Sequence, residues 1–566
     1  MRKLTVTALL ISLFTVSAIA AATEYRRLPV AEYEEKMQAG WIGQMVGVGW
    51  GYPTEFRWLG TIIPEDKVPE WKPKMVNQYA QDDLYVEMTF LRTLELYGID
   101  ASIRQAGIDF ANSGYALFEA NRNGRENLRK GIAPPDSGHP KFNGHADDID
   151  YQIEADYAGL ISPGLPNSGI QLGEVFGRLM NYGDGLYGGQ FVAGMYAEAF
   201  FEKDVEKIVR AGLACVPEGS QFHECITDVL KWHKENPDDW EKTWQLIEDK
   251  YDLDPEYRRG SCENSSRVGF NIDAKINAAY IVVGMLYGEG DVDKTIIISM
   301  RCGQDSDCNP SSAAGVLFTS LGWSAVPERF YSALDKETKF SHTPYTYPKL
   351  VEVCSKLARK VVINQGSRIE KDEDGREVFL IPVQKPKPSS LEQCWEAGPI
   401  ANSRFTEAEM EKIIPPPVEL ADPKMMAEAI ATFAPGWGIA DCGNQMSAGL
   451  HEELGGKKNV LETHPISKAR PCVLYKHVDV PQGKTILHLT LGHHESGDWN
   501  LIVVNGKIKT LLVTNVGSEN SKDGWMNVNI DLSEYAGTPI DLALMNGIGG
   551  GFFEAGYWAR IEIKTY

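Results

Sequence analysis

The sequence predicts a multidomain chain in which an all-α, helical domain is followed by an all-β antiparallel sandwich. The chain has 566 residues, more than a single hydrophobic core usually accommodates, so two or more domains are expected. Apolar residues recur with helical spacing from about 29 to 360, and with a period of two beyond 436. We therefore place a helical catalytic domain at 25–363, a connector at 364–435 and a β-sandwich at 436–566.

The first residues, 1–20, have the features of a secretory signal peptide. Arg2 and Lys3 precede a mostly apolar run, and Ala18-Ile19-Ala20 supplies the small-x-small pattern of a signal-peptidase site. The apolar run is shorter than the roughly 20 residues that a membrane-spanning helix needs, and no later segment qualifies. We expect a mature chain that is secreted or periplasmic and has no membrane span.

The helical domain shows its period most clearly near residue 90. Val86, Phe90, Leu94 and Tyr97 follow one another at spacings of four, four and three, and Gly98 then stands where a helix C-cap favours glycine. Similar helices are expected at 189–201, 274–288, 293–302 and 310–321. These segments are rich in Ala and Gly, which favours a closely packed helical bundle.

The C-terminal part changes character after two Pro-rich stretches, 385–388 and 415–417, which interrupt regular structure. Thr485 to Leu491 alternates between apolar and polar residues, and Trp499 to Val504 ends at Asn505-Gly506, a strong signal for a hairpin turn. Further strands are expected at 525–532, 540–545 and 557–563. Several short strands with regular turns are typical of an antiparallel sandwich.

Charge and cysteine content exclude some classes of partner and site. The net charge of −22 becomes −24 when Arg2 and Lys3 leave with the signal peptide. Such a surface repels nucleic acid and anionic lipid, so we expect no nucleic-acid partner. The nine Cys residues are odd in number and include no Cys-x-x-Cys pair, which disfavours both structural zinc and a fully paired disulfide framework. One or two disulfides stay open for an oxidising compartment.

The most informative segment is Arg301-Cys302-Gly303-Gln304-Asp305-Ser306-Asp307-Cys308-Asn309-Pro310, in a loop between two expected helices. Asp305 and Asp307, separated by one residue, can converge on one hard cation. Pro310 fits the first turn of the following helix. The alternative is that Asp307 or Asn309 only caps that helix.

A second acidic group stands at the start of the helix that contains Val86. Asp82 and Asp83 occupy its first turn, and Glu87 lies one turn beyond Asp83 on the same face. Acidic residues favour helix N-termini through the helix dipole, so simple capping is again the alternative. Two acidic helix starts, each followed by a packed helix, are better explained by one shared metal site.

Together these motifs resemble those of the ADP-ribosylglycohydrolases. The resemblance rests on Asp82-Asp83, on the Gly-Gln-Asp-Ser-Asp loop that leads into Ala313-Ala314-Gly315, and on the segment from Gly43 to Glu55. It covers roughly residues 35 to 335. It implies an all-α ADP-ribosylglycohydrolase-like domain with one or two Mg²⁺ or Mn²⁺ ions, which bind sugar hydroxyls and position a water near the anomeric carbon.

The resemblance also implies roles for individual residues. The metal ligands would be Gln81, Asp82, Asp83, Asp305, Asp307 and Cys308. Glu55 and Asp83 are the catalytic candidates, and Glu55 would do general acid/base work; its alternative is an ordinary exposed loop carboxylate. The family has Thr where this chain has Gln81 and Cys308. A glutamine still offers a hard oxygen, but a thiol suits Mg²⁺ poorly, so occupation of both metal positions stays open.

The chain is acidic where the family's Gly-rich loop would contact a nucleotide. On a helix, Asp147, Asp150 and Glu154 would share one stripe. A solvated acidic face is the alternative. If the stripe lines the cleft, it repels a pyrophosphate and suits sugar hydroxyls or a cationic leaving group. We therefore predict substrate contacts from Asp147, Asp148, Asp150 and Glu154.

Three other groups are weaker candidates. Asn271 and Asn277, near the start of the helix expected at 274–288, are predicted as substrate contacts, with ordinary capping as the alternative. His493-His494 with Asp498-Trp499 could form a sugar platform, unless Trp499 packs inside the sandwich. Lone His145 is more often a hydrogen-bonded structural residue than a ligand. The sandwich resembles a galactose-binding-type module, which would either hold a glycan or only brace the catalytic domain.

These observations predict a secreted, metal-dependent hydrolase that cleaves an O- or N-glycosidic bond in a carbohydrate, with a small-molecule or glycan substrate. The first alternative is an ADP-ribosyl hydrolase acting on ADP-ribosylated protein or an ADP-ribose derivative. The second is a non-catalytic sugar-binding protein in which Gln81 and Cys308 have disabled the metal centre. The third, two-metal phosphoester hydrolysis, is disfavoured because Arg301 is the only basic residue close to either acidic motif.

Overall fold

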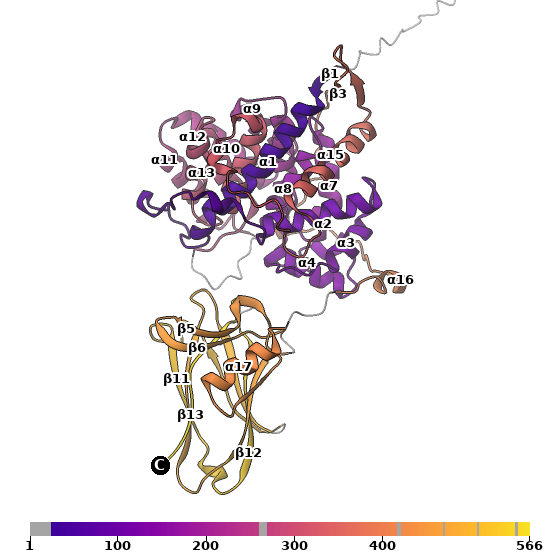
Figure 1. Ribbon diagram of the computed structural model, residues 1–566. Coiled ribbons are helices and arrows are strands. Elements are labelled where there is room, and N and C mark those ends of the chain that lie inside the picture. Colours follow the sequence, from indigo (N-terminus) through magenta and orange to yellow (C-terminus); the bar gives the residue numbers. More distant parts are fainter. Residues whose placement is uncertain (1–23, 260–268, 416–419, 468–469, 507–508, 550–552) are drawn as a thin grey trace, which may run out of the picture. The chain divides into compact units, whose positions relative to one another are not determined.

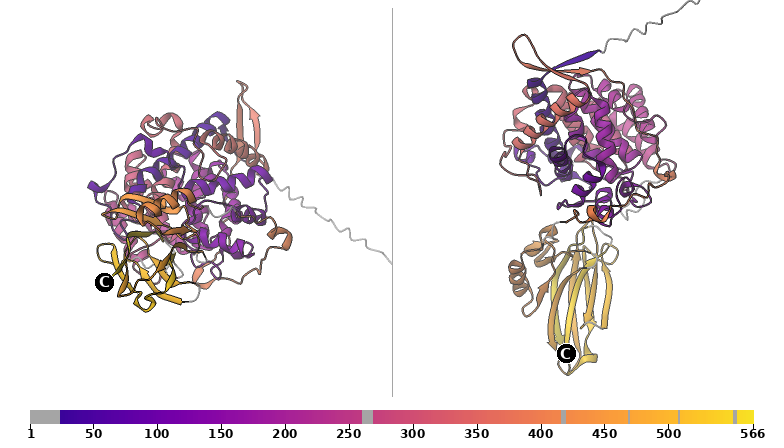
Figure 2. Two further views of the ribbon diagram at one scale, coloured as in Figure 1. Left: turned by 60° about the horizontal axis from the view of Figure 1, so that its bottom comes forward. Right: turned by 90° about the vertical axis from the view of Figure 1, so that its right-hand side faces the viewer.

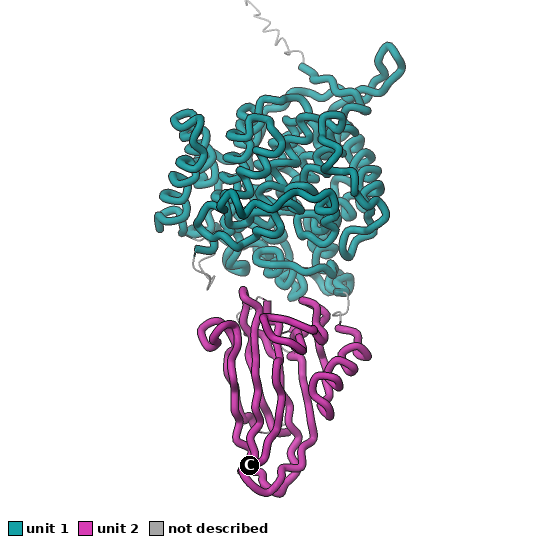
Figure 3. Tube along the Cα trace, turned by 60° about the vertical axis from the view of Figure 1, so that its left-hand side comes forward, with its two compact units in different colours: residues 1–416 teal, residues 417–566 magenta. Residues whose placement is uncertain are grey.

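The computed structural model describes residues 24–259, 269–415, 420–467, 470–506, 509–549 and 553–566. The expected signal peptide, 1–20, lies outside these residues. The chain divides into two compact units, 1–416 and 417–566 (Figure 3). The first unit is built from helices and the second from two β-sheets (Figure 1). The expected order of an all-α domain and an all-β sandwich is confirmed.

The first unit contains sixteen described α-helices, and those that the periodicity predicts are present. The α-helices are α1 (Val30–Gly51), α2 (Asp82–Tyr97), α3 (Ile103–Ala111), α4 (Glu119–Arg129), α5 (Asp150–Ile153), α6 (Asp156–Leu160), α7 (Pro166–Phe176), α8 (Asp184–Ala199), α9 (Val205–Leu213), α10 (Gln221–Glu235), α11 (Trp240–Ile247), α12 (Ala274–Gly288), α13 (Val292–Arg301), α14 (Cys308–Leu321), α15 (Tyr347–Asn364) and α16 (Glu407–Met410). Helix α2 ends before Gly98, whose φ of 88° favours glycine. No helix in the described ranges has both the length and the apolarity that crossing a bilayer requires.

Helices α1 and α14 pack closely, and this contact fixes the later functional loop. Helix α1 is buried on all sides from Ala39 to Gly51. Gly43, Gly47 and Gly51 recur every four residues along it and face the backbone of α14 and the loop before it. A Cβ on Gly43 would lie 2.5 Å from the carbonyl oxygen of Ala314. The two backbones can therefore approach only because these positions carry no side chain.

We expect Gly47→Ala to lower the free energy of unfolding by about 1–3 kcal/mol, because its Cβ would collide with the Pro310 carbonyl. Helix propensity acts in the opposite direction, since Ala favours a helix by about 1 kcal/mol over Gly. Urea unfolding of the purified protein measures the difference. Gly144→Ala is the control, because open space surrounds that exposed glycine. Equal stability of Gly47→Ala and the parent chain would show that α1 and α14 separate without cost.

The expected connector, 364–435, holds more regular structure than its Pro-rich composition indicates. Strands β2 (Arg368–Lys371) and β3 (Glu377–Pro382) form a hairpin that projects from the helical unit (Figure 2), and β3 pairs with β1 (Tyr25–Pro29). The short helix α16 follows before the first unit ends. Between β3 and α16, the backbone N–H groups of Ala401 and Ser403 each donate a hydrogen bond of 2.8 Å to the buried Asp136 carboxylate. This stretch is therefore fastened to the helical unit.

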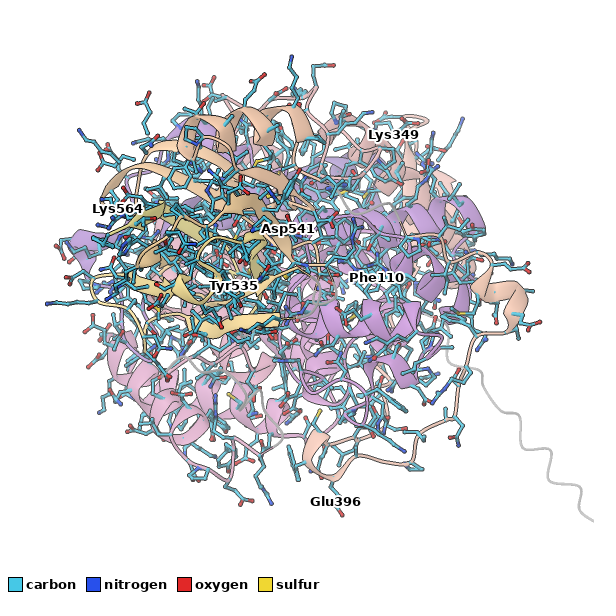
Figure 4. The ribbon with its side chains drawn as sticks, turned by 90° about the horizontal axis from the view of Figure 1, so that it is seen from below. Phe110, Lys349, Glu396, Tyr535, Asp541 and Lys564 are labelled. Atoms are coloured by element: carbon cyan, nitrogen blue, oxygen red, sulfur yellow. The ribbon has the colours of Figure 1, made fainter. Side chains whose placement is uncertain are left out.

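The second unit is an antiparallel sandwich with one helix, α17 (Pro423–Phe433). Its strands are β4 (Gly438–Ala440), β5 (Gly449–Leu454), β6 (Lys457–Thr463), β7 (Cys472–Asp479), β8 (Thr485–His493), β9 (Trp499–Asn505), β10 (Lys509–Val516), β11 (Trp525–Asp531), β12 (Pro539–Ile548) and β13 (Gly556–Thr565). The two sheets have the orders β10-β9-β12-β7-β4 and β11-β8-β13-β6-β5. Asp541 and Lys564, both labelled in Figure 4, are charged and exposed residues of these sheets.

The core of the sandwich decides the role of Trp499. This side chain is fully buried, its ring centroid lies 5.2 Å from that of Trp558, and its Nε1–H donates to the Gly492 carbonyl at 2.9 Å. The suggested sugar platform at Trp499 is therefore wrong, because the residue packs between the sheets. Strands β9 and β10 pair from Asn505 and Lys509 onward, which confirms the hairpin expected at Asn505-Gly506. The eight cysteines in the described ranges are free thiols.

Candidate metal centre

The starts of α2 and α14 bring the two acidic motifs together. Asp82, Asp83 and Cys308 each offer a ligand atom, and these atoms lie within 4.8 Å of one another. The same holds for Asp305, Asp307 and Cys308. Because Cys308 belongs to both groups, the four carboxylates surround one centre. We call these five residues the candidate metal centre; that they ligate an ion stays a prediction.

Three of the four carboxylates of the centre are buried, Asp82 is half-buried, and two of the buried ones lack a partner that a buried charge needs. One oxygen of Asp83 and one of Asp305 are buried without any hydrogen-bond partner. Burial raises the pKa of Asp83, and the charges of Asp82 and Asp305 raise it further. Burial and the charges of Asp305 and Asp150 raise the pKa of Asp82 to about 7. Buried carboxylates are costly unless a cation or donors compensate them, so a hard divalent ion fits this donor set.

Cys308 and Gln81 are the two predicted metal ligands that carry no carboxylate. The Cys308 thiol donates to Oδ2 of Asp83 at 3.2 Å, and burial raises its pKa. The thiol is thus a hydrogen-bond donor within the centre, and its role as a metal ligand stays a prediction. Half-buried Gln81 precedes α2, and its side chain makes no capping bond to that helix. The carboxylates of the centre are thus better donors for Mg²⁺ than Cys308.

Glu55 lies beside the centre, in the loop that follows the 3₁₀ turn Tyr52–Thr54. The Thr54 hydroxyl lies 2.8 Å from that of Ser306, and the Phe56 N–H donates to the Gln304 carbonyl at 3.0 Å. These bonds fasten the loop to the Asp305 loop. Burial first, and then the charge of Glu55, raises the pKa of Asp307. Glu55 is half-buried, which argues against an ordinary exposed carboxylate.

The acidic segment differs from the expected helical stripe. Helix α5 spans only Asp150–Ile153, and Glu154 is its C-cap. The segment instead forms hydrogen bonds to residues that are distant in the sequence. For example, the Ile149 N–H donates to the Ile272 carbonyl at 3.0 Å. Asp147, Asp148, Asp150 and Glu154 are each at most 6% exposed, so the alternative of a solvated acidic face is wrong as well.

Most of these acidic side chains have structural partners. Asp148 and Asp150 both accept the Ala120 N–H, each at 3.1 Å, and so cap the start of α4. Glu154 accepts the side-chain amide of Asn121, and its other oxygen is buried without a partner. The charge of Asp150 raises the pKa of Asp82, and the charge of Asp82 contributes to raising the pKa of Glu154, whereas Asp147 belongs to a separate cluster around Lys275.

Asn271 and Asn277, two further predicted substrate contacts, are buried, and His145 is partly buried. The Asn271 side chain donates to Asp252 at 2.6 Å, and that of Asn277 donates to the Asp273 carbonyl at 3.0 Å. Both residues thus brace the start of α12. His145 lies 3.0 Å from a Glu119 oxygen, and burial together with Arg122 lowers its pKa to about 4. This agrees with a neutral, structural histidine.

Sequence reasoning missed Gln304, which is fully buried. Its side-chain oxygen accepts the Asn271 N–H at 3.0 Å, and its side-chain nitrogen donates to the Gly269 carbonyl at 2.8 Å. Its own N–H donates to the Trp58 carbonyl at 2.9 Å. One residue of the Asp305 loop therefore holds both the Glu55 loop and the segment before α12. Because these partners are distant in the sequence, no local pattern marks Gln304.

Comparison with known proteins supports a family for the first unit. A sequence model described as ADP-ribosylglycohydrolase matches residues 29–366. Among solved structures, the chain is similar to an "ADP-ribosylglycohydrolase-related protein complex", at 15% identity over 58% of this chain and 99% of that one, with a TM-score of 0.36. A cyclase from Fischerella sp. in its apo form matches at 14% identity over 26% and 78%, with a TM-score of 0.17. A search of curated proteins finds no significant match.

Proposed function

The chain belongs to the ADP-ribosylglycohydrolase family, and from this premise we propose that it is an exported, metal-dependent hydrolase of a carbohydrate glycoside. The family supports hydrolysis of a glycosidic bond. The observation that carries metal dependence is the candidate metal centre, where buried oxygens of Asp83 and Asp305 have no partner. Export rests on the signal-peptide features of residues 1–20.

The carboxylates of Asp82, Asp83, Asp305 and Asp307 would hold one or two Mg²⁺ or Mn²⁺ ions. When bound, such an ion supplies electrostatic attraction for sugar hydroxyls and polarises a water near the anomeric carbon. The bonds through Thr54 and Phe56 keep the Glu55 loop against these carboxylates.

Glu55 and Asp83 are our candidates for moving protons. Glu55, half-buried beside Asp307, would donate a proton to the oxygen of the leaving group. Asp83 would accept a proton from the attacking water. The Cys308 thiol donates to its Oδ2 at 3.2 Å and so orients that carboxylate.

The electrostatics around the centre favour a neutral or cationic glycoside over an ADP-ribosyl group. Asp150 and Glu154 place two more acidic groups close enough to Asp82 to interact with it, and the whole chain carries a net charge of −22. A pyrophosphate would meet like charge in a medium of reduced dielectric constant. ADP-ribosyl hydrolysis fits the family equally well and is the second candidate, and a catalytically inactive sugar-binding protein is the third.

Metal content and ligand preference test this function. We expect the purified protein to retain Mg²⁺ or Mn²⁺, to hydrolyse a member of a panel of aryl glycosides and oligosaccharides, and to bind free ADP-ribose weakly. Like-charge repulsion of a few kcal/mol corresponds to a loss of about two decades in affinity. Calorimetric titration of the metal-loaded protein with ADP-ribose measures that affinity. Micromolar binding, with no glycoside turned over, would make ADP-ribosyl hydrolysis the better assignment.

A further inference from the structure

Two aromatic side chains meet beside the candidate metal centre. The ring centroids of Phe56 and Phe270 lie 5.1 Å apart, with their planes at 47°. Both rings pack against a small apolar cluster formed by Ile149, Ile153, Ile272 and Cys308. Cys308 is also part of the candidate metal centre, so the two rings border it. Both residues are only half-buried, and part of their surface stays accessible.

The backbone around this pair is fixed by Gln304. The Phe56 N–H donates to its carbonyl at 3.0 Å, and its side chain bonds to the backbone of Gly269 and Asn271 on either side of Phe270. Phe56 and Gln304 have φ values of 49° and 53°, in the left-handed region that residues with a Cβ seldom adopt. Such strain persists only where the surrounding structure imposes it. The two rings are therefore held in place relative to the Asp305 loop.

We propose that Phe56 and Phe270 form an aromatic wall that binds the flat apolar face of the leaving group. This inference rests on the proposed function. A general acid must come within hydrogen-bond reach of the leaving-group oxygen, and Glu55 directly precedes Phe56. Our proposal accordingly places the group attached to that oxygen against the wall. Aromatic rings bury flat apolar faces and favour offset or tilted contacts, so the wall suits an aryl ring or the C–H face of a second sugar.

Phe270→Ala tests the wall with glycosides of one sugar that differ only in the leaving group. Cyclohexyl and methyl glycosides form a matched pair, because one alcohol carries an apolar six-membered ring with C–H faces and the other does not. We expect kcat/KM for the cyclohexyl glycoside to fall about 10-fold, which corresponds to the loss of one ring contact, and that for the methyl glycoside to stay within about 2-fold. A phenyl glycoside and a disaccharide in the same assay show whether the wall serves an aryl group, a sugar or both.

The control is Tyr97→Ala, which removes an exposed aromatic ring from the opposite end of α2, about 21 Å from Asp83 at the helical rise per residue. It should leave both glycosides unaffected. Phe270→Leu replaces Phe270→Ala if the smaller side chain prevents folding, as judged by circular dichroism. An equal loss of rate on the cyclohexyl and methyl glycosides would overturn the wall and leave the proposed function standing.

Failure of the proposed function has a different signature. If the parent chain hydrolyses no glycoside, binding of 4-nitrophenol to the same proteins is followed by difference absorbance. Binding that is lost in Phe270→Ala and kept in Tyr97→Ala supports a site for flat apolar rings, with hydrolysis refuted. Binding that is equal in the parent chain and both variants overturns the wall.

Discussion

Replacing Asp305 or Asp307 by Ala should abolish retention of the divalent metal and lower glycoside turnover by at least about 100-fold, while the protein still folds. Each residue contributes a carboxylate to the centre that also contains Asp82 and Asp83. Removing one of the four carboxylates that would ligate the ion weakens the attraction for the ion and disturbs the coordination geometry. Elemental analysis of the purified variants, together with their kcat on the best glycoside, measures both losses.

The same variants should be no less stable than the parent chain once metal is removed by a chelator. Asp305 has a buried oxygen without a partner, and its charge raises the pKa of Asp82 and Asp83. Loss of that charge relieves repulsion and desolvation in the folded state. Asp374→Ala, at an exposed ion pair, is the control and should retain full metal content. Unchanged metal stoichiometry in both centre variants would refute the assignment.

The sequence predicts the helices well where the local pattern and the packing agree. Helix α12 occupies the expected residues Ala274–Gly288. Helix α2 ends at Tyr97, directly before Gly98, where the C-cap is expected. Several strands of the sandwich were missed. Strands β5 and β6 flank Gly455-Gly456, a turn signal that was available, but their Glu- and Lys-rich residues obscure the alternation. Strand β3 pairs with β1, which lies far from it in the sequence, and no local sequence pattern predicts such a pairing.

In the site, too, residues marked by a local sequence pattern could be predicted, and residues that act through contacts with distant segments could not. Asp82-Asp83 and Asp305 with Asp307 could be found because paired acids at helix starts are a local signal, and the structure brings them together. The acidic segment was misread as one helix, because hydrogen bonds to Ile272 and to other distant residues interrupt it. Gln304 went unnoticed for the same reason, since its role consists of contacts with two segments that are distant in the sequence.

Lys275 is a buried cation, 1% exposed, whose ammonium group pairs with the carboxylate of Asp273 at the start of α12. Burial alone would lower its pKa, but the charges of Asp273, Asp184 and Asp147 outweigh burial and raise it. We expect Lys275→Met to lower the free energy of unfolding by about 3–5 kcal/mol, because it leaves three buried carboxylates without their cation. Urea unfolding at pH 8 measures the loss.

The pH dependence and a second substitution identify the cause of that loss. Without Lys275 the carboxyl groups take up protons more readily in the folded state than in the unfolded state, so stability falls as pH rises. The destabilisation by Lys275→Met should therefore shrink between pH 8 and pH 5. Adding Asp273→Asn removes one uncompensated charge and should restore part of the stability. The asparagine keeps a side-chain oxygen that can accept the capping bond from the backbone N–H of residue 275.

Lys294→Met, at an exposed lysine, is the control and should change stability by less than about 0.5 kcal/mol. A loss that does not vary with pH and is not relieved by Asp273→Asn would mean that Lys275 acts through the packing of its aliphatic chain and that its charge contributes little.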